Sequence, residues 1–203
     1  MTRVKLCGLR DEAAVKTVNR LKPDYAGFIC SKPFRRYVER DILRHLNEML
    51  DPEIKAVGVF VNEPIETVVS CVKETGIDAV QLHGKEDNAY IRSLKERISC
   101  PVFQAVKLRS AEDAERANCS AADLLVADGG TGEGKTFDWS LLGHLRRDYL
   151  LAGGLNPGNA EEAVRQIHPY GVDTSSGIET DGKKDPVKME QFVYAVRRAD
   201  NDK

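Results

Sequence analysis

Short apolar runs recur along the chain at intervals typical of strands that alternate with helices. Eight runs, rich in β-branched and aromatic residues, begin at residues 3, 24, 54, 78, 101, 123, 149 and 170. Successive starts are about 20–30 residues apart, which is the length that a strand and a crossover helix together require. The runs are almost continuously apolar, as expected of parallel strands that are covered on both faces.

The segments between these runs have the spacing of amphipathic helices. In residues 62–76, Asn62 is the expected N-cap, Pro64 lies in the first turn and Gly76 is a stop signal. Two later amphipathic segments, each with a proline near its start, are residues 156–169 and 185–199.

Eight strand–helix repeats predict an α/β fold, a single-domain (β/α)8 or TIM barrel over residues 1–203. The alternative is an open, doubly wound sheet, and the lack of a glycine-rich dinucleotide-binding motif favours the closed barrel. No linker or low-complexity segment interrupts the sequence. We therefore expect one catalytic domain rather than two.

Composition and charge narrow the classes of function. The 30 basic and 32 acidic side chains give a formal net charge of −2, so nothing indicates nucleic acid as a partner. No apolar run approaches the roughly 20 residues that cross a bilayer, so no membrane partner is expected. The first residues lack the apolar core of a secretory signal, which favours a cytoplasmic protein.

The cysteines favour neither a metal site nor a disulfide framework. They are odd in number and widely spaced, and none belongs to a CxxC pair. Two of them, Cys7 and Cys30, end predicted strands, where they could either pack or react. The complete set is Cys7, Cys30, Cys71, Cys100 and Cys119.

Candidate functional residues are those at the C-terminal ends of the strands, where TIM barrels place their active sites. The first strand ends at Cys7 and the sixth at Asp128. The fourth ends near Gln81 and His83. The seventh and eighth strands end in AGG and DTSSG, which offer backbone N–H groups and hydroxyls to a phosphate. Both ends could instead be simple tight turns. The phosphate candidates are Gly153, Gly154, Ser175, Ser176 and Gly177.

Two loops add candidates. After the second strand, SKPFRRYV contains Lys32 and Arg35, which we expect to be solvated, and Arg36, which suits bidentate binding of a carboxylate. After the sixth strand, the segment 128–139 reads DGGTGEGKTFDW. Its four glycines predict a mobile loop over the active site, with Asp138 and Trp139 at the start of the next helix.

These motifs, taken in order, resemble those of the phosphoribosylanthranilate isomerase family. The matching segments are VKLCGL, GFIC with RYV, VGVFVN, VQLHGKE, GGTGEGKTFDW, AGGLNPGNA and DTSSGIETDGKKD. The resemblance implies a (β/α)8 isomerase of tryptophan biosynthesis that performs an Amadori rearrangement. The implied substrate is the phosphosugar N-(5-phosphoribosyl)anthranilate, and no cofactor or metal is implied.

The resemblance also implies the roles of the reacting groups. Asp128 corresponds to the general acid that protonates the ribose ring oxygen, and Cys7 to the general base that removes the C2′ proton. Asp123, at the other end of the same strand, is interpreted as structural. Lys5 is a candidate charge that favours the thiolate form of Cys7, because only a few per cent of an ordinary thiol is ionised near neutral pH. Cys30 is interpreted as a packing residue.

The remaining implied roles concern binding. Arg36 corresponds to the arginine near the anthranilate carboxylate, although Arg35 precedes it directly and is also a candidate. Gly153, Gly154, Ser176 and Gly177 correspond to the phosphate site. The pocket-lining residues are Gln81, His83 and Asp173.

Two alternatives stay open at this point. One is another phosphosugar TIM-barrel enzyme of histidine or tryptophan biosynthesis. The other is a non-catalytic phosphosugar-binding barrel, which would not need both Cys7 and Asp128. For the isomerase as for these alternatives, the sequence allows a monomer or a homodimer.

Overall fold

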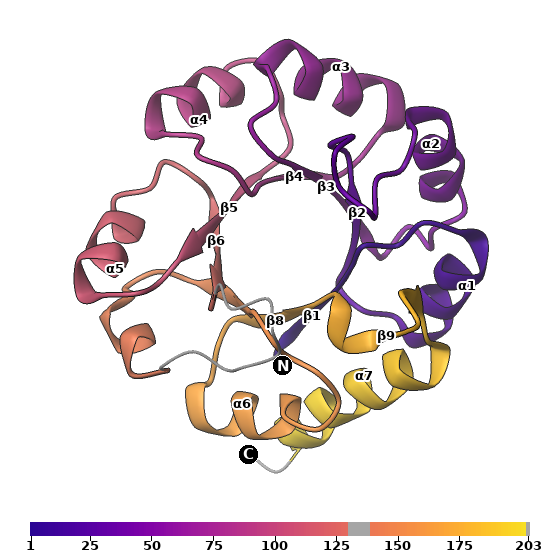
Figure 1. Ribbon diagram of the computed structural model, residues 1–203, viewed down its shortest axis with the longest axis vertical. Helices are drawn as coiled ribbons and strands as arrows, with labels where there is room; N and C mark the ends of the chain where they lie inside the picture. Colours follow the sequence, from indigo (N-terminus) through magenta and orange to yellow (C-terminus); the bar gives the residue numbers. More distant parts are fainter. Residues whose placement is uncertain (130–138, 202–203) are drawn as a thin grey trace.

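Eight parallel strands form a closed barrel in the computed structural model, which describes residues 1–129 and 139–201 (Figure 1). The barrel closes where β1 pairs with β8, which excludes the open sheet and confirms the predicted TIM barrel. Each strand begins within a residue of its predicted start. The strands are β1 (Arg3–Cys7), β2 (Tyr25–Ile29), β3 (Lys55–Phe60), β4 (Ala79–Leu82), β5 (Val102–Lys107), β6 (Leu124–Asp128), β7 (Tyr149–Ala152) and β8 (Gly171–Thr174).

The helices form a ring around the barrel (Figure 1). None of those described combines the length and the apolar run that a bilayer crossing requires. The predicted mobile loop falls largely on residues 130–138, outside the described residues, and Trp139 begins a 3-10 helix. The helices are α1 (Glu12–Leu21), α2 (Arg40–Glu48), α3 (Ile65–Thr75), α4 (Asn88–Lys95), α5 (Ala111–Asn118), the 3-10 helix η1 (Trp139–His144), α6 (Ala160–Ile167) and α7 (Pro186–Asn201).

The predicted N-cap of α3 is wrong, whereas its predicted stop is confirmed. The helix is preceded directly by Pro64, and Gly76 ends it in the left-handed conformation. Asn62 lies further upstream with a φ of 53°, and its side-chain oxygen accepts a hydrogen bond from the backbone N–H of Lys85. Asn62 therefore connects the loops after β3 and β4 instead of capping the helix.

Two apolar cores follow from the alternation of side chains along each strand. On β1, Val4 and Leu6 point outward into the larger core between barrel and helices. The inward-facing side chains form a second core inside the barrel, which includes Phe103, Val126 and Leu150. Towards the C-terminal ends of the strands the inward positions become polar, and this polar layer is the floor of the candidate site.

Aspartates connect neighbouring strands at the N-terminal rim. Asp24, Asp78 and Asp123 directly precede β2, β4 and β6. Each accepts a hydrogen bond from a backbone N–H at the start of the preceding strand, at 2.8, 2.9 and 2.8 Å respectively. Asp123 thus binds the N–H of Val102, at the rim opposite Asp128, as its structural interpretation requires.

Replacing Asp123 with alanine should reduce stability and leave catalysis intact. The substitution leaves the N–H of Val102 without its acceptor, so the free energy of unfolding should fall by about 1–3 kcal/mol. Urea denaturation measures this change, and steady-state turnover of the folded variant should stay within twofold of the parent. A folded Asp123→Ala enzyme with severely reduced turnover would contradict the structural assignment.

Candidate active site

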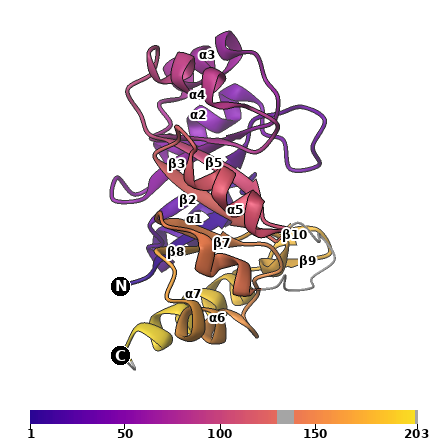
Figure 2. The same cartoon turned by 90° about the vertical axis from the view of Figure 1, so that its left-hand side faces the viewer.

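A short hairpin covers one side of the barrel's active end. After β8, the 3-10 helix η2 (Ser176–Ile178) leads into β9 (Glu179–Thr180), which pairs with β10 (Lys183–Lys184). Figure 2 shows the hairpin at the end of the barrel opposite the two chain termini. The sequence analysis missed this hairpin. Its signal is Asp181–Gly182, whose φ angles of 51° and 74° fit a two-residue hairpin turn.

Cys7 is buried at the end of β1, where tight backbone packing surrounds its thiol. Its register partner on β2 is Gly27, and a Cβ added to Gly27 would lie 2.7 Å from the Sγ of Cys7. The next residue, Gly8, has a φ of 79°, and a Cβ there would lie 2.9 Å from the Oγ of Ser175. Glycine on both sides therefore leaves the space that the thiol and the loop after β8 occupy.

Positive charges surround Cys7. Lys5 is fully buried two residues before it, and the Nζ of Lys5 lies 3.1 Å from the Oδ1 of Asp173. Burial lowers the pKa of Lys5, but Asp173 and a negative charge on Cys7 outweigh that effect, so the net direction is upward. The pKa of Arg36 is raised mainly by its hydrogen bonds to Glu179. Burial opposes this effect, and a negative charge on Cys7 adds to it. Lys5 is therefore placed as a cation next to the thiol.

Asp173 is the central acidic group of the site. Burial raises the pKa of its carboxyl, an effect that the neighbouring Lys5 opposes. Asp173 also interacts electrostatically with His83 and with Asp128. Asp173 on β8 is thus paired with Lys5 on β1 and interacts electrostatically with the ends of β4 and β6.

The second predicted catalytic residue, Asp128, belongs to a short polar chain. Its Oδ2 lies 3.3 Å from the Nε2 of His83, and the Nδ1 of His83 lies 3.4 Å from the Nε2 of Gln81. The side-chain oxygen of Gln81 is buried and has no hydrogen-bond partner among the described residues. A polar atom of that kind is rare in a protein interior, and here it can accept a hydrogen bond from a ligand.

The loops after β7 and β8, which carry the predicted phosphate residues, lie against each other. Gly153 and Gly154 have φ angles of 88° and 73°, which side chains other than glycine rarely adopt. A Cβ added to Gly177 would lie 2.0 Å from the carbonyl oxygen of Leu155. The same oxygen accepts a hydrogen bond of 2.7 Å from the hydroxyl of Thr174. The predicted phosphate residues are thereby brought together, with Ser176 next to Gly177.

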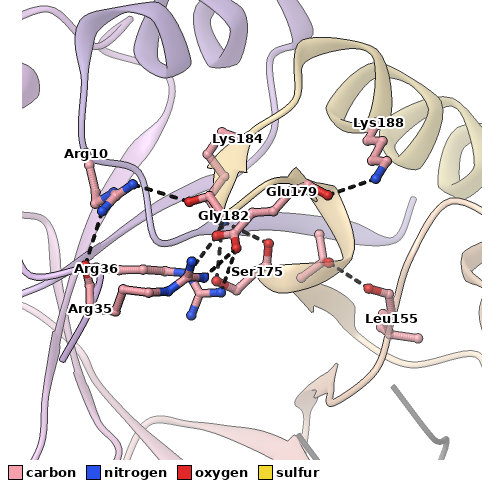
Figure 3. A network of polar contacts seen from close by, with 10 residues as sticks. Arg10, Arg35, Arg36, Leu155, Ser175, Glu179, Gly182, Lys184 and Lys188 are labelled. Carbon is pink, nitrogen blue, oxygen red and sulfur yellow. Dashed lines mark hydrogen bonds and ion pairs between the residues drawn. The ribbon is translucent and has the colours of Figure 1, made fainter. Parts of the chain in front are cut away.

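Arg36 is held by a carboxylate that the sequence analysis missed (Figure 3). Its Nε and Nη2 donate to the two oxygens of Glu179 at 2.6 and 2.8 Å. Lys184 donates to the same carboxylate at 2.9 Å. Burial alone would raise the pKa of Glu179, but hydrogen bonds from Arg36 and Lys184 reverse this and lower it to about 2. Glu179 is therefore ionised at any pH at which the enzyme would work.

The two neighbouring arginines differ in position. The side chain of Arg36 is 24% exposed, whereas that of Arg35 is 58% exposed. Arg35 reaches the same carboxylate from outside and lies next to Gly182 at the hairpin turn. Because a charge on Cys7 acts on Arg36, the geometry favours Arg36 as the arginine of the pocket.

The other cysteines are poorly placed for proton transfer. Hydrogen bonding to Cys71 and burial raise the pKa of the Cys30 thiol well above its usual value, which suits a packing residue. Burial likewise raises the pKa of Cys100, and Cys119 is an exposed free thiol. In the part of the chain that the structure describes, no group of three or more histidine, cysteine or acidic side chains is arranged to hold a metal ion.

Comparison with known proteins identifies the family. The sequence profile of N-(5'-phosphoribosyl)anthranilate (PRA) isomerase matches residues 4–195. The chain belongs to this isomerase family. A relative of that name from Acetivibrio thermocellus is 43% identical over 98% of each chain. The expected membership of this family, and with it the isomerase function in tryptophan biosynthesis, is confirmed.

Solved structures agree with this assignment. One is a phosphoribosyl anthranilate isomerase in complex with reduced 1-(o-carboxyphenylamino)-1-deoxyribulose 5-phosphate; it is 33% identical, with a TM-score of 0.87 over 98% of this chain and all of its own. Another consists of mutually generated monomers of the dimeric enzyme from Thermotoga maritima. It is 34% identical over the same shares of each chain, also with a TM-score of 0.87.

Removing the charge of Lys5 should strongly destabilise the protein. In Lys5→Met the carboxyl of Asp173 stays buried without its partner, so the free energy of unfolding should fall by about 3–5 kcal/mol. The matched control is Lys16→Met, which breaks the exposed Lys16–Glu12 pair and should leave the free energy of unfolding nearly unchanged, because solvent screens that pair. Urea denaturation of both variants measures the difference. If Lys5→Met were as stable as Lys16→Met, the buried pair would contribute nothing to folding.

The low pKa of Glu179 predicts a specific acid sensitivity. The pKa falls from an ordinary value of 4.5 to about 2 on folding, so the unfolded chain binds the extra proton between these values. The stabilisation is complete above pH 4.5 and is lost as the pH falls towards 2. Denaturation at pH 6 and pH 3 should therefore show a smaller acid loss in Glu179→Gln than in the parent. A loss of equal size would refute the assigned ion pairs.

Proposed function

We propose that this isomerase converts N-(5'-phosphoribosyl)anthranilate into 1-(2-carboxyphenylamino)-1-deoxyribulose 5-phosphate, with Asp128 as general acid and Cys7 as general base. The observation that carries the proposal is the position of both groups at the same barrel mouth. Cys7 ends β1 next to Lys5, and Asp128 ends β6 next to His83. Asp173, the buried partner of Lys5, also interacts electrostatically with Asp128.

The first step is opening of the ribose ring. Asp128 donates a proton to the ring oxygen, the C1′–O bond breaks, and the nitrogen lone pair forms the iminium. A positioned acid contributes about 10²–10⁴-fold to such a step. The contact of 3.3 Å with His83 orients the carboxyl, and Gly153 allows the loop after β7 to lie against it, since a Cβ there would be 2.8 Å from its Oδ1.

The second step is proton abstraction from C2′. The Cys7 thiolate takes this proton, and the electron pair of the C–H bond neutralises the iminium to give an enolamine. Protonation at C1′ and loss of the enol proton then give the ketone. The sugar carbon C2′ is oxidised and C1′ is reduced within one molecule, so the reaction needs no external electron carrier. Lys5, buried two residues before Cys7, and Arg36 are the cations close to this step.

The two anionic ends of the substrate have separate binding sites in this proposal. Arg36 binds the anthranilate carboxylate from the loop after β2. Gly153, Gly154, Ser176 and Gly177 bind the phosphate through the adjoining loops after β7 and β8. Gln81, His83 and Asp173 line the pocket between them. This arrangement places C1′ and C2′ over the polar layer that contains Cys7 and Asp128.

The quaternary state and the compartment are further parts of the proposal. The free thiols of all five cysteines fit a reducing cytoplasm. We expect a monomer or a homodimer, which sedimentation velocity distinguishes.

Turnover is measured by the loss of fluorescence of the anthranilate substrate. Cys7→Ala and Asp128→Ala should each reduce kcat by at least about 10²–10³-fold, because each removes a proton-transfer group. Product affinity, measured by calorimetry, should change little. The matched control is Cys30→Ala, which replaces the other cysteine at a strand end and should retain near-parental turnover.

Either of two results would contradict the proposal. Parent protein that leaves the substrate unchanged beyond its spontaneous decay would remove the isomerase assignment. A near-normal rate in Cys7→Ala or Asp128→Ala would remove that residue from the mechanism.

A further inference from the structure

The carboxylate of Glu179 lies among cations at the rim of the active site, and the reaction described above makes no use of it. Its side chain is 8% exposed. It accepts hydrogen bonds from Arg36, from Arg35 at 2.8 Å and from Lys184 at 2.9 Å (Figure 3). Three cations thus share one acidic group, which leaves the rim positively charged towards an anionic ligand.

The contact between Glu179 and Arg36 uses only one edge of the guanidinium. Nε and Nη2 donate to the two carboxylate oxygens at 2.6 and 2.8 Å, which is the side-on bidentate arrangement. Among the described residues, Nη1 of Arg36 has no hydrogen-bond partner. A guanidinium has five N–H donors, so the Nη1–Nη2 edge retains three. That edge has the geometry to bind a second carboxylate in a bidentate manner.

The backbone that carries Glu179 is itself held in place. Glu179 pairs directly with Lys184 in the β9–β10 ladder. Arg10 donates to the carbonyl oxygen of Gly182 in the hairpin turn, and Lys188 donates to the carbonyl oxygen of Glu179. The hairpin is thereby fastened to the loop after β1 and to α7. A carboxylate on such a support fixes its partner more firmly than one on an unsupported loop.

We propose that Glu179 is a positioning residue that fixes the Arg36 guanidinium, so that its outer edge recognises the ring carboxylate of the substrate. The inference rests on the proposed function, in which Arg36 binds that carboxylate. An arginine that samples several rotamers in the free enzyme would lose conformational entropy on binding the substrate. Some of those rotamers could also direct its guanidinium towards Cys7 instead of the carboxylate. Glu179 removes this freedom before the substrate arrives, because the ion pair already exists in the free enzyme.

The competing explanation is that Glu179 only stabilises the hairpin and the loop after β8. Lys184 also donates to the carbonyl oxygen of Ser175 at 2.8 Å, so loss of Glu179 could disturb the phosphate end instead. The two explanations differ in which end of a ligand they affect. A positioning role acts on a ligand that carries the ring carboxylate, whereas a structural role acts on any ligand with the phosphate.

Calorimetric binding of two product analogues separates these explanations. One probe is reduced 1-(o-carboxyphenylamino)-1-deoxyribulose 5-phosphate, and the other is the same compound with an unsubstituted phenyl ring. Glu179→Gln should weaken the first probe about tenfold, as expected for one charge-assisted contact. It should weaken the second less than twofold. In steady state the variant should raise KM and leave kcat within about twofold.

Further variants complete the experiment. In an Arg36→Lys background, Glu179→Gln should cause no additional loss, because the residue acts through Arg36. The matched control is Glu115→Gln, which breaks a bidentate pair between Glu115 on α5 and Arg146 in the loop before β7 and should change neither affinity. If Glu179→Gln does not fold, Glu179→Asp keeps the charge and shortens its reach, and it should lose the same discrimination in part.

The outcomes are distinguishable. Equal losses for both probes, an unchanged affinity for the carboxylate probe, or unfolding of both Glu179 variants would overturn the positioning role. A parent enzyme that binds both probes equally would show that Arg36 does not bind the carboxylate. That result would overturn both this part of the proposed function and the present inference. A parent that discriminates, together with an equally discriminating Glu179→Gln variant, would overturn the inference alone.

Discussion

The buried ion pair between Lys5 and Asp173 is the interaction on which the active end depends. The two residues are direct partners across the seam where β1 meets β8 and the barrel closes. Because both are buried, neither charge can be left alone without a large loss of stability. The same pair supplies the cation beside Cys7 and the carboxylate that interacts with Asp128. The same ion pair therefore stabilises the closed barrel and sets the charges around the active site.

Features with a local cause could be predicted from the sequence. Each strand is a short apolar run because both of its faces are covered, so the eight strands follow from hydrophobicity, and their alternation with helices predicts their order in a barrel. The strand ends then locate Cys7 and Asp128 at one mouth, because parallel strands of a barrel all end there. Gly153 and Gly154 are candidates because residues without a Cβ let their backbone N–H groups approach a ligand, and the structure adds that both have positive φ angles.

Features that depend on contacts between distant segments could not be predicted. The contacts of Glu179 form only when the hairpin folds over the loop after β2. Its partner Arg36 in that loop is 143 residues away along the chain. The pairing of Lys5 with Asp173 requires the barrel to close, since 168 residues separate them. Asn62 failed as an N-cap for the same reason, because its side chain binds the loop after β4. The resemblance supplied roles for single residues but none of these pairings.

The aspartates of the N-terminal rim divide the barrel into units of two strands. Asp24, Asp78 and Asp123 fasten β1 to β2, β3 to β4 and β5 to β6, whereas β7 and β8 are joined at the other rim through Leu155. Among the described residues, no aspartate side chain of this rim joins β2 to β3 or β4 to β5 in the same way, although the backbone ladder continues through both pairs. New chain termini opened between β2 and β3, or between β4 and β5, would leave every unit whole. Circular permutation at either of these two points would therefore preserve every one of these aspartate contacts.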